Sequence, residues 1–192
     1  ELSTDEMYRL IDDFAAIGTA GIGFTGGEPI LRPDMLDIVR YTKKTGMVTH
    51  MSSNGRIIAS KEIARKVVES GLDAIGFSVD GALPKTHDTI RGKGSYEKVL
   101  QAIDNIVSLR KELKSKIKVV VVCVVSNYNV DQLVDLVTIL KQKGVDHVSF
   151  MPFHDIGLFS SGKENSEEFK IEEEKINRLN QAVDQLINIR KK

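Results

Sequence analysis

The chain has 192 residues, its 27 Lys and Arg balance its 27 Asp and Glu, and 41% of its residues are hydrophobic. This composition predicts one folded domain with a sizeable core and argues against overall disorder. Zero net charge gives no electrostatic reason to expect nucleic acid or an anionic membrane as a partner. No apolar run approaches the roughly 18 residues of a membrane-spanning helix, and no secretory signal opens the chain. We therefore expect a cytoplasmic protein whose single cysteine, Cys123, is a buried thiol within a run of valines.

Helix and strand signals alternate along the chain. A capping box at Ser3 and Glu6 opens a helix that ends at Gly18. Short apolar runs predict strands at 22–24, 47–51, 74–79, 118–125 and 147–151. The other predicted helices are 33–45, three that Ser60, Ser95 and Asn129 cap, and a last one that carries Ile176, Leu179, Val183, Leu186 and Ile187 on one face. Five strands alternating with six helices predict a parallel sheet with right-handed crossovers.

Polar or permissive residues follow every predicted strand. In parallel α/β folds, ligands bind at the carboxyl ends of the strands, which lie along one edge of the sheet. These strand ends read Thr25-Gly26-Gly27-Glu28-Pro29, Ser52-Ser53-Asn54-Gly55, Ser78-Val79-Asp80-Gly81, Ser126-Asn127 and Met151-Pro152. Each stretch alone is most often ordinary turn chemistry. Together, on one edge, they indicate a ligand site.

The charged residues near this edge suit an amino-acid ligand. Gly26 and Gly27 let a ligand approach the backbone closely, and Glu28 supplies a carboxylate for an ammonium group. Arg91, in a predicted loop at 86–92, suits bidentate capture of a carboxylate. The alternatives are a plain turn and a solvated arginine. His87 has no second ligand pair at metal-binding spacing, so we predict a capping or loop role for it.

These stretches resemble, in order and spacing, the motifs of radical S-adenosylmethionine (radical SAM) enzymes. The matching segments are 24–29, 31–34, 53–55, 78–81 and 87–92. The nearest subgroup contains molybdenum-cofactor, haem-related and peptide-modifying enzymes. The resemblance implies a partial (β/α)6 TIM-like barrel with parallel strands, of which the first is missing and five are present. It also implies a barrel core at 1–159, followed at 160–192 by a polar loop and a helix that could connect to a further domain.

The resemblance further implies a binding site for S-adenosylmethionine (AdoMet). Glu28 and the two glycines would hold the methionine amino group, and Arg91 would meet the carboxylate. The complete set of implied cofactor-binding residues is Thr25, Gly26, Gly27, Glu28, Pro29, Ser53, Asn54, Ser78, Asp80, Arg91, Ser126 and Met151. In the family, a reduced 4Fe-4S cluster cleaves AdoMet to a 5′-deoxyadenosyl radical that abstracts hydrogen from substrate. The implied partners are an electron-donor protein and a small-molecule or peptide substrate.

One family feature is absent from the sequence. The cluster is normally held by a Cys-x3-Cys-x2-Cys motif, and Cys123 is the only cysteine here. We expect a chain truncated just after that motif, since Glu1 lies where the cysteine loop of the family would have just ended, and such a piece alone should be inactive. The alternative is a natural cluster-free barrel that binds a nucleoside, an amino acid or a protein. A third reading is an unrelated α/β barrel enzyme that uses Asp80 or Glu28 as a general base.

Overall fold

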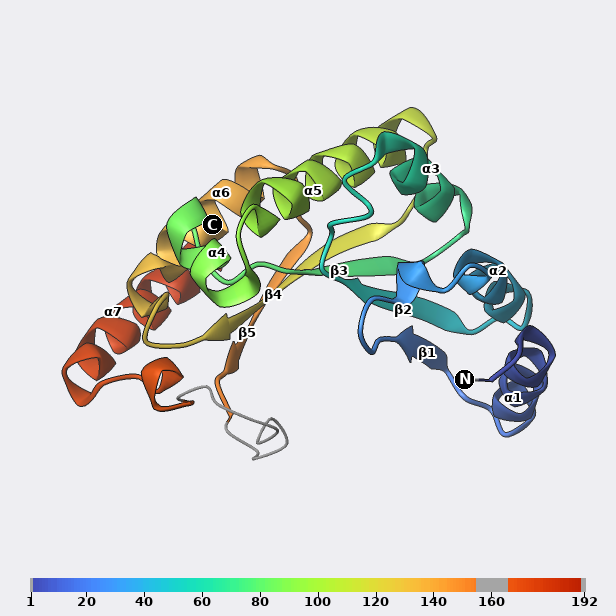
Figure 1. Ribbon diagram of the computed structural model, residues 1–192, viewed down its shortest axis with the longest axis horizontal. Helices are drawn as coiled ribbons and strands as arrows, with labels where there is room; N and C mark the ends of the chain where they lie inside the picture. The colour runs from blue at the N-terminus through green and yellow to red at the C-terminus, as the bar shows by residue number, and fades with distance from the viewer. Residues whose placement is uncertain (1, 155–165, 191–192) are drawn as a thin grey trace.

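The computed structural model describes residues 2–154 and 166–190. Five parallel strands form a single sheet in the order β1-β2-β3-β4-β5, so each strand pairs with the next one in the chain. The strands are β1 (Gly21–Phe24), β2 (Val48–Ser53), β3 (Ala74–Ser78), β4 (Lys118–Val125) and β5 (His147–Pro152). The sheet curves into an arch whose edges are β1 and β5, as Figure 1 shows. The predicted partial barrel with five parallel strands is confirmed.

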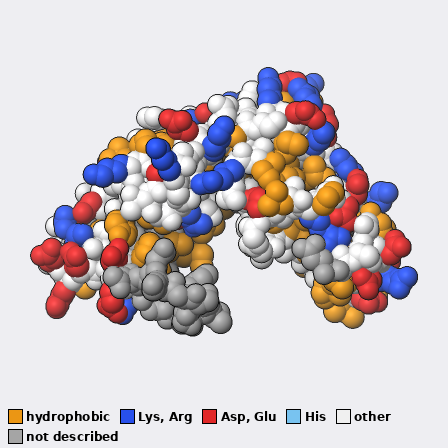
Figure 2. Space-filling view, viewed as in Figure 1, with side chains coloured by type: hydrophobic (Ala, Val, Ile, Leu, Met, Phe, Trp, Pro, Cys, Tyr) orange, Lys and Arg blue, Asp and Glu red, His pale blue; other side chains and the backbone are white. Residues whose placement is uncertain are grey.

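Helices cover the convex side of the arch and leave the concave side open (Figure 1). The α-helices are α1 (Thr4–Ala16), α2 (Met35–Lys44), α3 (Lys61–Glu69), α4 (Pro84–Arg91), α5 (Ser95–Glu112), α6 (Leu133–Gln142) and α7 (Glu173–Arg190). Three short 3-10 helices accompany them: η1 (Pro29–Leu31), η2 (Val130–Gln132) and η3 (Ser166–Phe169). Figure 2 shows the arch hollowed below the sheet, with basic and acidic side chains interspersed over the face in view.

The core lies between the sheet and the helices. Strand side chains alternate between the two faces, and the parallel register aligns those that face the helices. Ile75 pairs with Val119, and Phe77 with Val121, and all four are fully buried. Several side chains that point to the concave face, those of Ser78, Val120 and Val122, are only half-buried. Cys123 belongs to the buried row, as predicted, and burial raises the pKa of its thiol far above the usual range.

One predicted loop is a helix. The segment expected to be a loop at 86–92 forms most of α4, so the six predicted helices omitted one element. Pro84 occupies the first turn of α4, where its missing N–H costs no hydrogen bond. Another helix starts later than predicted: α2 begins at Met35, after Asp34 in the N-cap position, and Pro33 lies outside it. The capping box of α1 at Ser3 and Glu6 is confirmed.

One predicted N-cap is wrong, and a second is correct in position but makes no capping bond. Ser95 is the first residue of α5, and Gly94 takes the N-cap position with a φ of 74°. The cap comes from α4, because the Asp88 carboxylate accepts hydrogen bonds from the N–H groups of Gly94 (2.6 Å) and Tyr96 (2.9 Å). These two bonds lower the pKa of Asp88. Asn129 occupies the N-cap position of η2, as predicted, but its side chain makes no capping bond there and hydrogen-bonds to Asp80 and Val124 at the end of the sheet instead.

The predicted apolar face of the last helix is divided. Leu179 and Leu186 of α7 pack against the core, whereas Ile176, Val183 and Ile187 are 44%, 43% and 47% exposed. The helix contacts α6 and η2, and these contacts leave three of the five side chains partly exposed. The boundary expected at 159/160 and most of the predicted polar loop lie outside the described residues. Over the described ranges, no helix is both long and apolar enough to cross a membrane.

Candidate functional site

The turn after β1 presents a carboxylate whose position β2 fixes. Glu28 Oε1 accepts a hydrogen bond from the Ser53 hydroxyl at 2.8 Å, and Oε2 accepts one from the Asn54 N–H at 2.7 Å. Ser53 is buried and also accepts a bond from the Gly55 N–H, so its hydroxyl supports Glu28 and does not face a ligand. The carboxylate keeps further acceptor positions, because two bonds do not saturate its four lone-pair sites.

The backbone ahead of Glu28 is open. Thr25, Gly26 and Gly27 are exposed, and a Cβ added at either glycine would have no neighbour within 4 Å. Gly26 adopts a φ of 133°, a conformation that residues with side chains rarely take. Pro29 is half-buried and starts η1 directly after the turn. A polar ligand can therefore reach both the bare backbone and the carboxylate.

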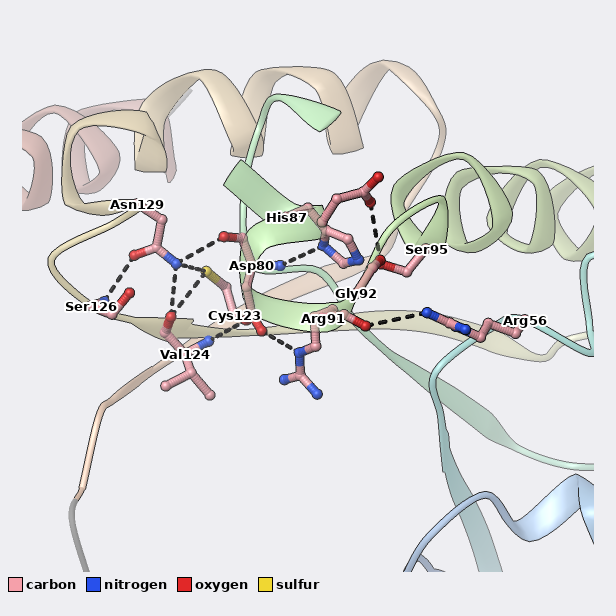
Figure 3. Close-up of polar contacts among 11 residues, drawn as sticks. Arg56, Asp80, His87, Arg91, Gly92, Ser95, Cys123, Val124, Ser126 and Asn129 are labelled. Atoms are coloured by element: carbon pink, nitrogen blue, oxygen red, sulfur yellow. Dashed lines mark hydrogen bonds and ion pairs between the residues drawn. The ribbon is translucent and has the colours of Figure 1, made fainter. Parts of the chain in front are cut away.

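A second cluster joins the ends of β3 and β4. The Asp80 side chain is 1% exposed. Its Oδ1 accepts from the Val124 N–H at 2.8 Å, and its Oδ2 pairs with Nε of Arg91. Figure 3 shows these contacts, with the Arg91 guanidinium extending beyond the carboxylate. With both oxygens engaged and no exposed surface, Asp80 is not placed to serve as a general base.

Arg91 is the exposed member of this cluster. Its side chain is 36% exposed, and Asp80 is the one partner of its guanidinium within the described part of the chain. The Arg91 carbonyl accepts a bond from an Arg56 terminal nitrogen at 3.3 Å, which ties the end of α4 to the loop after β2. The two terminal nitrogens of Arg91 thus stay available to an anionic ligand.

Asn129 organises the end of β4. Its Oδ1 accepts from the Ser126 N–H at 2.8 Å, and its Nδ2 donates to the carbonyls of Val124 (2.8 Å) and Asp80 (3.0 Å). Ser126 is 1% exposed, and its hydroxyl has no hydrogen-bond partner in the structure. A buried hydroxyl without a partner is uncommon in folded proteins, so it indicates a missing ligand atom or water.

His87 is a structural residue of the same cluster. It is 1% exposed, and its Nδ1 accepts a bond from the Asp80 N–H at 3.1 Å. Burial lowers its pKa, so the ring is neutral and Nδ1 is free to accept. Helix α4 packs tightly on this strand end, because a Cβ at Gly81 would lie 2.9 Å from the His87 backbone nitrogen. The prediction that His87 is a capping or loop residue is therefore wrong. His87 is a buried residue of α4 that hydrogen-bonds to the backbone after β3.

Three further predicted residues, Ser78, Met151 and Asn54, lie on the same edge of the sheet. Ser78 ends β3 on the half-buried concave face, and Met151 in β5 is 50% exposed. Asn54 is exposed, and its Oδ1 accepts a bond from the Arg56 N–H at 2.9 Å. A cleft of about 640 Å³ between α1, β1 and α2 opens next to this edge and includes Gly27 and Glu28 in its lining.

Sequence reasoning missed Asn129 and His87 as members of the site. Asn129 stands where an N-cap is expected, and that local pattern conceals its bonds to Asp80, 49 residues earlier. The bond from the Val124 N–H to the Asp80 side chain could not be predicted either, because the apolar pattern of β4 carries no information about backbone donors. Asp80 and Ser126 differ in this respect, because their positions directly after β3 and β4 do indicate the site from the sequence.

A sequence model described as the Radical SAM superfamily matches residues 1–137. The chain belongs to the radical SAM superfamily. The Fe-coproporphyrin III synthase of Methanosarcina barkeri (strain Fusaro) is 32% identical over 97% of this chain and 43% of its own length. The GTP 3′,8-cyclase of Limosilactobacillus fermentum is 35% identical over 81% of this chain and 46% of its own. The chain thus spans less than half of each of these radical SAM relatives.

Solved structures share the fold of this radical SAM core. Streptococcus suis SuiB bound to S-adenosylmethionine superposes with a TM-score of 0.74 at 16% identity, covering 95% of this chain and 40% of SuiB. SuiB bound to its precursor peptide SuiA gives 0.75 at 17% identity, with 96% and 39% coverage. The radical SAM family uses AdoMet and a 4Fe-4S cluster, so both cofactors predicted from the resemblance are confirmed at the level of the family.

The two cofactors differ in how well these residues suit them. The open glycines, the fixed Glu28 carboxylate, the unpaired Ser126 hydroxyl and the free end of Arg91 fit a ligand that carries an ammonium, a carboxylate and hydroxyl groups. The cluster does not fit. Cys123 is the one cysteine of the sequence and is fully buried, and the described residues hold no group of three His, Cys, Asp or Glu that could bind a metal ion.

Proposed function

We propose that this chain is the AdoMet-binding core of a radical SAM enzyme. One observation carries the proposal: the edge of the sheet presents two charges of opposite sign, each fixed by hydrogen bonds. Ser53 and Asn54 hold the Glu28 carboxylate, and Asp80 holds the Arg91 guanidinium. Such a pair suits the ammonium and carboxylate ends of the methionine part of AdoMet.

The other residues of the edge would complete the site. Gly26 and Gly27 leave room for the methionine backbone, and Thr25 and Pro29 flank them. Ser78 and Asn54 would face the ribose or the methionine part. Ser126 would give its free hydroxyl to the nucleoside, and Met151 would pack against the adenosine.

The chemistry of the complete enzyme is also part of the proposal. A reduced 4Fe-4S cluster would supply the one electron that splits the sulfonium of AdoMet into methionine and a 5′-deoxyadenosyl radical, which would take hydrogen from a substrate. The role of this chain is to bind and orient AdoMet, since its one thiol cannot hold the cluster. The cluster ligands would lie N-terminal to Glu1.

The similar proteins and the family resemblance support proposals for the substrate, the partners and the location of the protein. The relatives include a GTP 3′,8-cyclase and an Fe-coproporphyrin III synthase, and the structure of SuiB is known with its precursor peptide bound. We propose a small-molecule or peptide substrate, an electron-donor protein and a cytoplasmic location. We also propose that residues 160–192, which end in α7, connect the 1–159 core to a further domain.

The test uses the full-length protein that carries this chain, reconstituted with iron and sulfide in the absence of oxygen. After reduction with dithionite, chromatography should detect 5′-deoxyadenosine and methionine, formed slowly even without substrate. The Glu28→Ala variant should form far less at the same AdoMet concentration. The 192-residue chain alone should take up no cluster.

The alternative is a cluster-free barrel that binds a nucleoside, an amino acid or a protein, and the buried state of the single cysteine is the observation that favours it. AdoMet binding with normal affinity and no 5′-deoxyadenosine from the reconstituted full-length protein would support this alternative.

A further inference from the structure

Every polar atom of Asp80 already has a partner within the protein. Its backbone N–H donates to Nδ1 of His87, and its carbonyl accepts from Nδ2 of Asn129. Oδ1 accepts from the Val124 N–H, and Oδ2 pairs with Arg91. The residue is 1% exposed. A direct contact between Asp80 and AdoMet, which the resemblance implied, would require this buried carboxylate to become exposed, because its remaining lone pairs face the protein interior.

The four bonds fix Asp80 relative to three elements at once. Its backbone continues from β3, Val124 belongs to β4, and His87 and Arg91 are on α4. Figure 3 shows Asp80 at the junction of these elements. The carboxylate is therefore rigidly placed, because no rotation of its side chain preserves both of its bonds. The carboxylate in turn fixes the position of the Arg91 guanidinium that pairs with it.

The ion pair between Asp80 and Arg91 involves only one of the three guanidinium nitrogens. Asp80 engages Nε, the nitrogen nearest the aliphatic stem, and leaves both terminal nitrogens without a partner among the described residues. Those two nitrogens form the end of the planar guanidinium fork, which matches the two oxygens of a carboxylate. The side chain is 36% exposed, so this end is accessible.

We propose that Asp80 is a positioning residue that acts through Arg91. It holds the guanidinium at Nε so that the two terminal nitrogens meet the AdoMet carboxylate end-on, as a bidentate pair. The inference rests on the proposed function, and it assigns Asp80 to the orientation of the cofactor without a contact to it. A free arginine would have to lose side-chain entropy on binding, and the ion pair removes part of that cost in advance.

The test measures affinity for two ligands that differ in one group. Calorimetric titration of the full-length, cluster-loaded protein would use AdoMet and decarboxylated AdoMet, which lacks the carboxylate. Asp80→Asn should bind AdoMet about tenfold more weakly and decarboxylated AdoMet as the wild type does, within about twofold. In an Arg91→Ala background, adding Asp80→Asn should cause no further loss for either ligand.

Three results would overturn the inference. Equal losses for both ligands would assign Asp80 a purely structural role, and an undiminished loss in the Arg91→Ala background would assign it a direct contact. Unchanged AdoMet affinity in a folded Asp80→Asn protein would exclude any role of Asp80 in AdoMet binding.

If Asp80→Asn does not fold, Asp80→Glu keeps the charge but displaces it by one methylene, and it should give the same selective loss of AdoMet affinity. A wild type that binds no AdoMet would overturn the proposed function itself, which distinguishes the two failures.

Discussion

The hydroxyl of Ser53, at the end of β2, donates a 2.8 Å hydrogen bond to Oε1 of Glu28, which follows β1. This bond and the one from Asn54 hold a carboxylate at the edge of the sheet before any ligand arrives. Preorganisation of this kind lowers the cost of binding, because the charged group does not have to be ordered by the ligand.

Replacing Glu28 with alanine should weaken AdoMet binding by the full-length protein about ten- to hundredfold. The lost interaction is a charge-assisted hydrogen bond to an ammonium group, worth roughly 1.5–3 kcal/mol. Titration calorimetry measures the change. Glu97→Ala, at an exposed position of α5, is the matched control and should bind normally. An unchanged affinity for Glu28→Ala would remove Glu28 from the site.

Arg91→Lys should bind AdoMet about tenfold more weakly than the wild type. A lysine ammonium is a point charge that cannot pair with Asp80 and present a two-pronged fork to a carboxylate at the same time. Equilibrium dialysis with labelled AdoMet would measure the loss. The control is Arg40→Lys on α2, where the exposed ion pair with Asp37 tolerates a point charge. Equal affinities for the two variants would contradict the role of Arg91.

Ser126→Ala should weaken AdoMet binding without lowering the stability of the free protein. The Ser126 hydroxyl is buried without a partner, so its removal should leave the melting temperature of the free protein unchanged or slightly raised. AdoMet affinity should fall roughly two- to tenfold if the hydroxyl bonds to the ligand, since a neutral hydrogen bond contributes about 0.5–1.5 kcal/mol. Thermal melts with and without AdoMet test both parts. A large loss of stability in the free protein would show that the hydroxyl already has a partner.

Asn129→Ala should show the opposite pattern, a loss of stability by about 3 kcal/mol or more. The buried amide makes three hydrogen bonds to backbone groups, of Ser126, Val124 and Asp80, besides a 3.6 Å bond to Cys123 Sγ, and alanine would remove all of these partners. Urea unfolding would measure the free energy of unfolding. Asn180→Ala, on the exposed face of α7, is the control and should change stability by less than about 0.5 kcal/mol.

Stability should fall as the pH drops below about 6.5, and His87 should account for part of the fall. Burial lowers the pKa of His87 in the folded state, so below its unfolded pKa of about 6.5 the unfolded chain binds a proton that the folded chain does not. The contribution is complete above that pH and declines by up to about 1.4 kcal/mol per pH unit below it. Burial also lowers the pKa of His50, which contributes equally to the wild type and to a His87 variant and so cancels when the two are compared. His87→Asn should unfold with a shallower pH dependence between pH 7 and 5, and equal slopes would contradict the prediction.

The sequence by itself determined the alternation of elements. Apolar periodicity and the glycine and capping signals predicted five parallel strands, and the strand ends predicted which residues share an edge. These signals are local, since each depends on residues within a few positions of one another. The capping box at Ser3 and Glu6 was correct for this reason, as both partners lie within one turn.

Only the tertiary structure decided which polar groups pair. Asp88 caps α5 in place of Ser95, and Asn129 bonds to Asp80 in place of capping η2. Ser53 turned out to support Glu28 across 25 residues of sequence. The physical reason is that a side-chain hydrogen bond requires two groups within about 3 Å at the correct angle. Propensity and spacing along the chain place a residue at the end of a strand, but the distance to its partner exists only once the strands and helices have packed together.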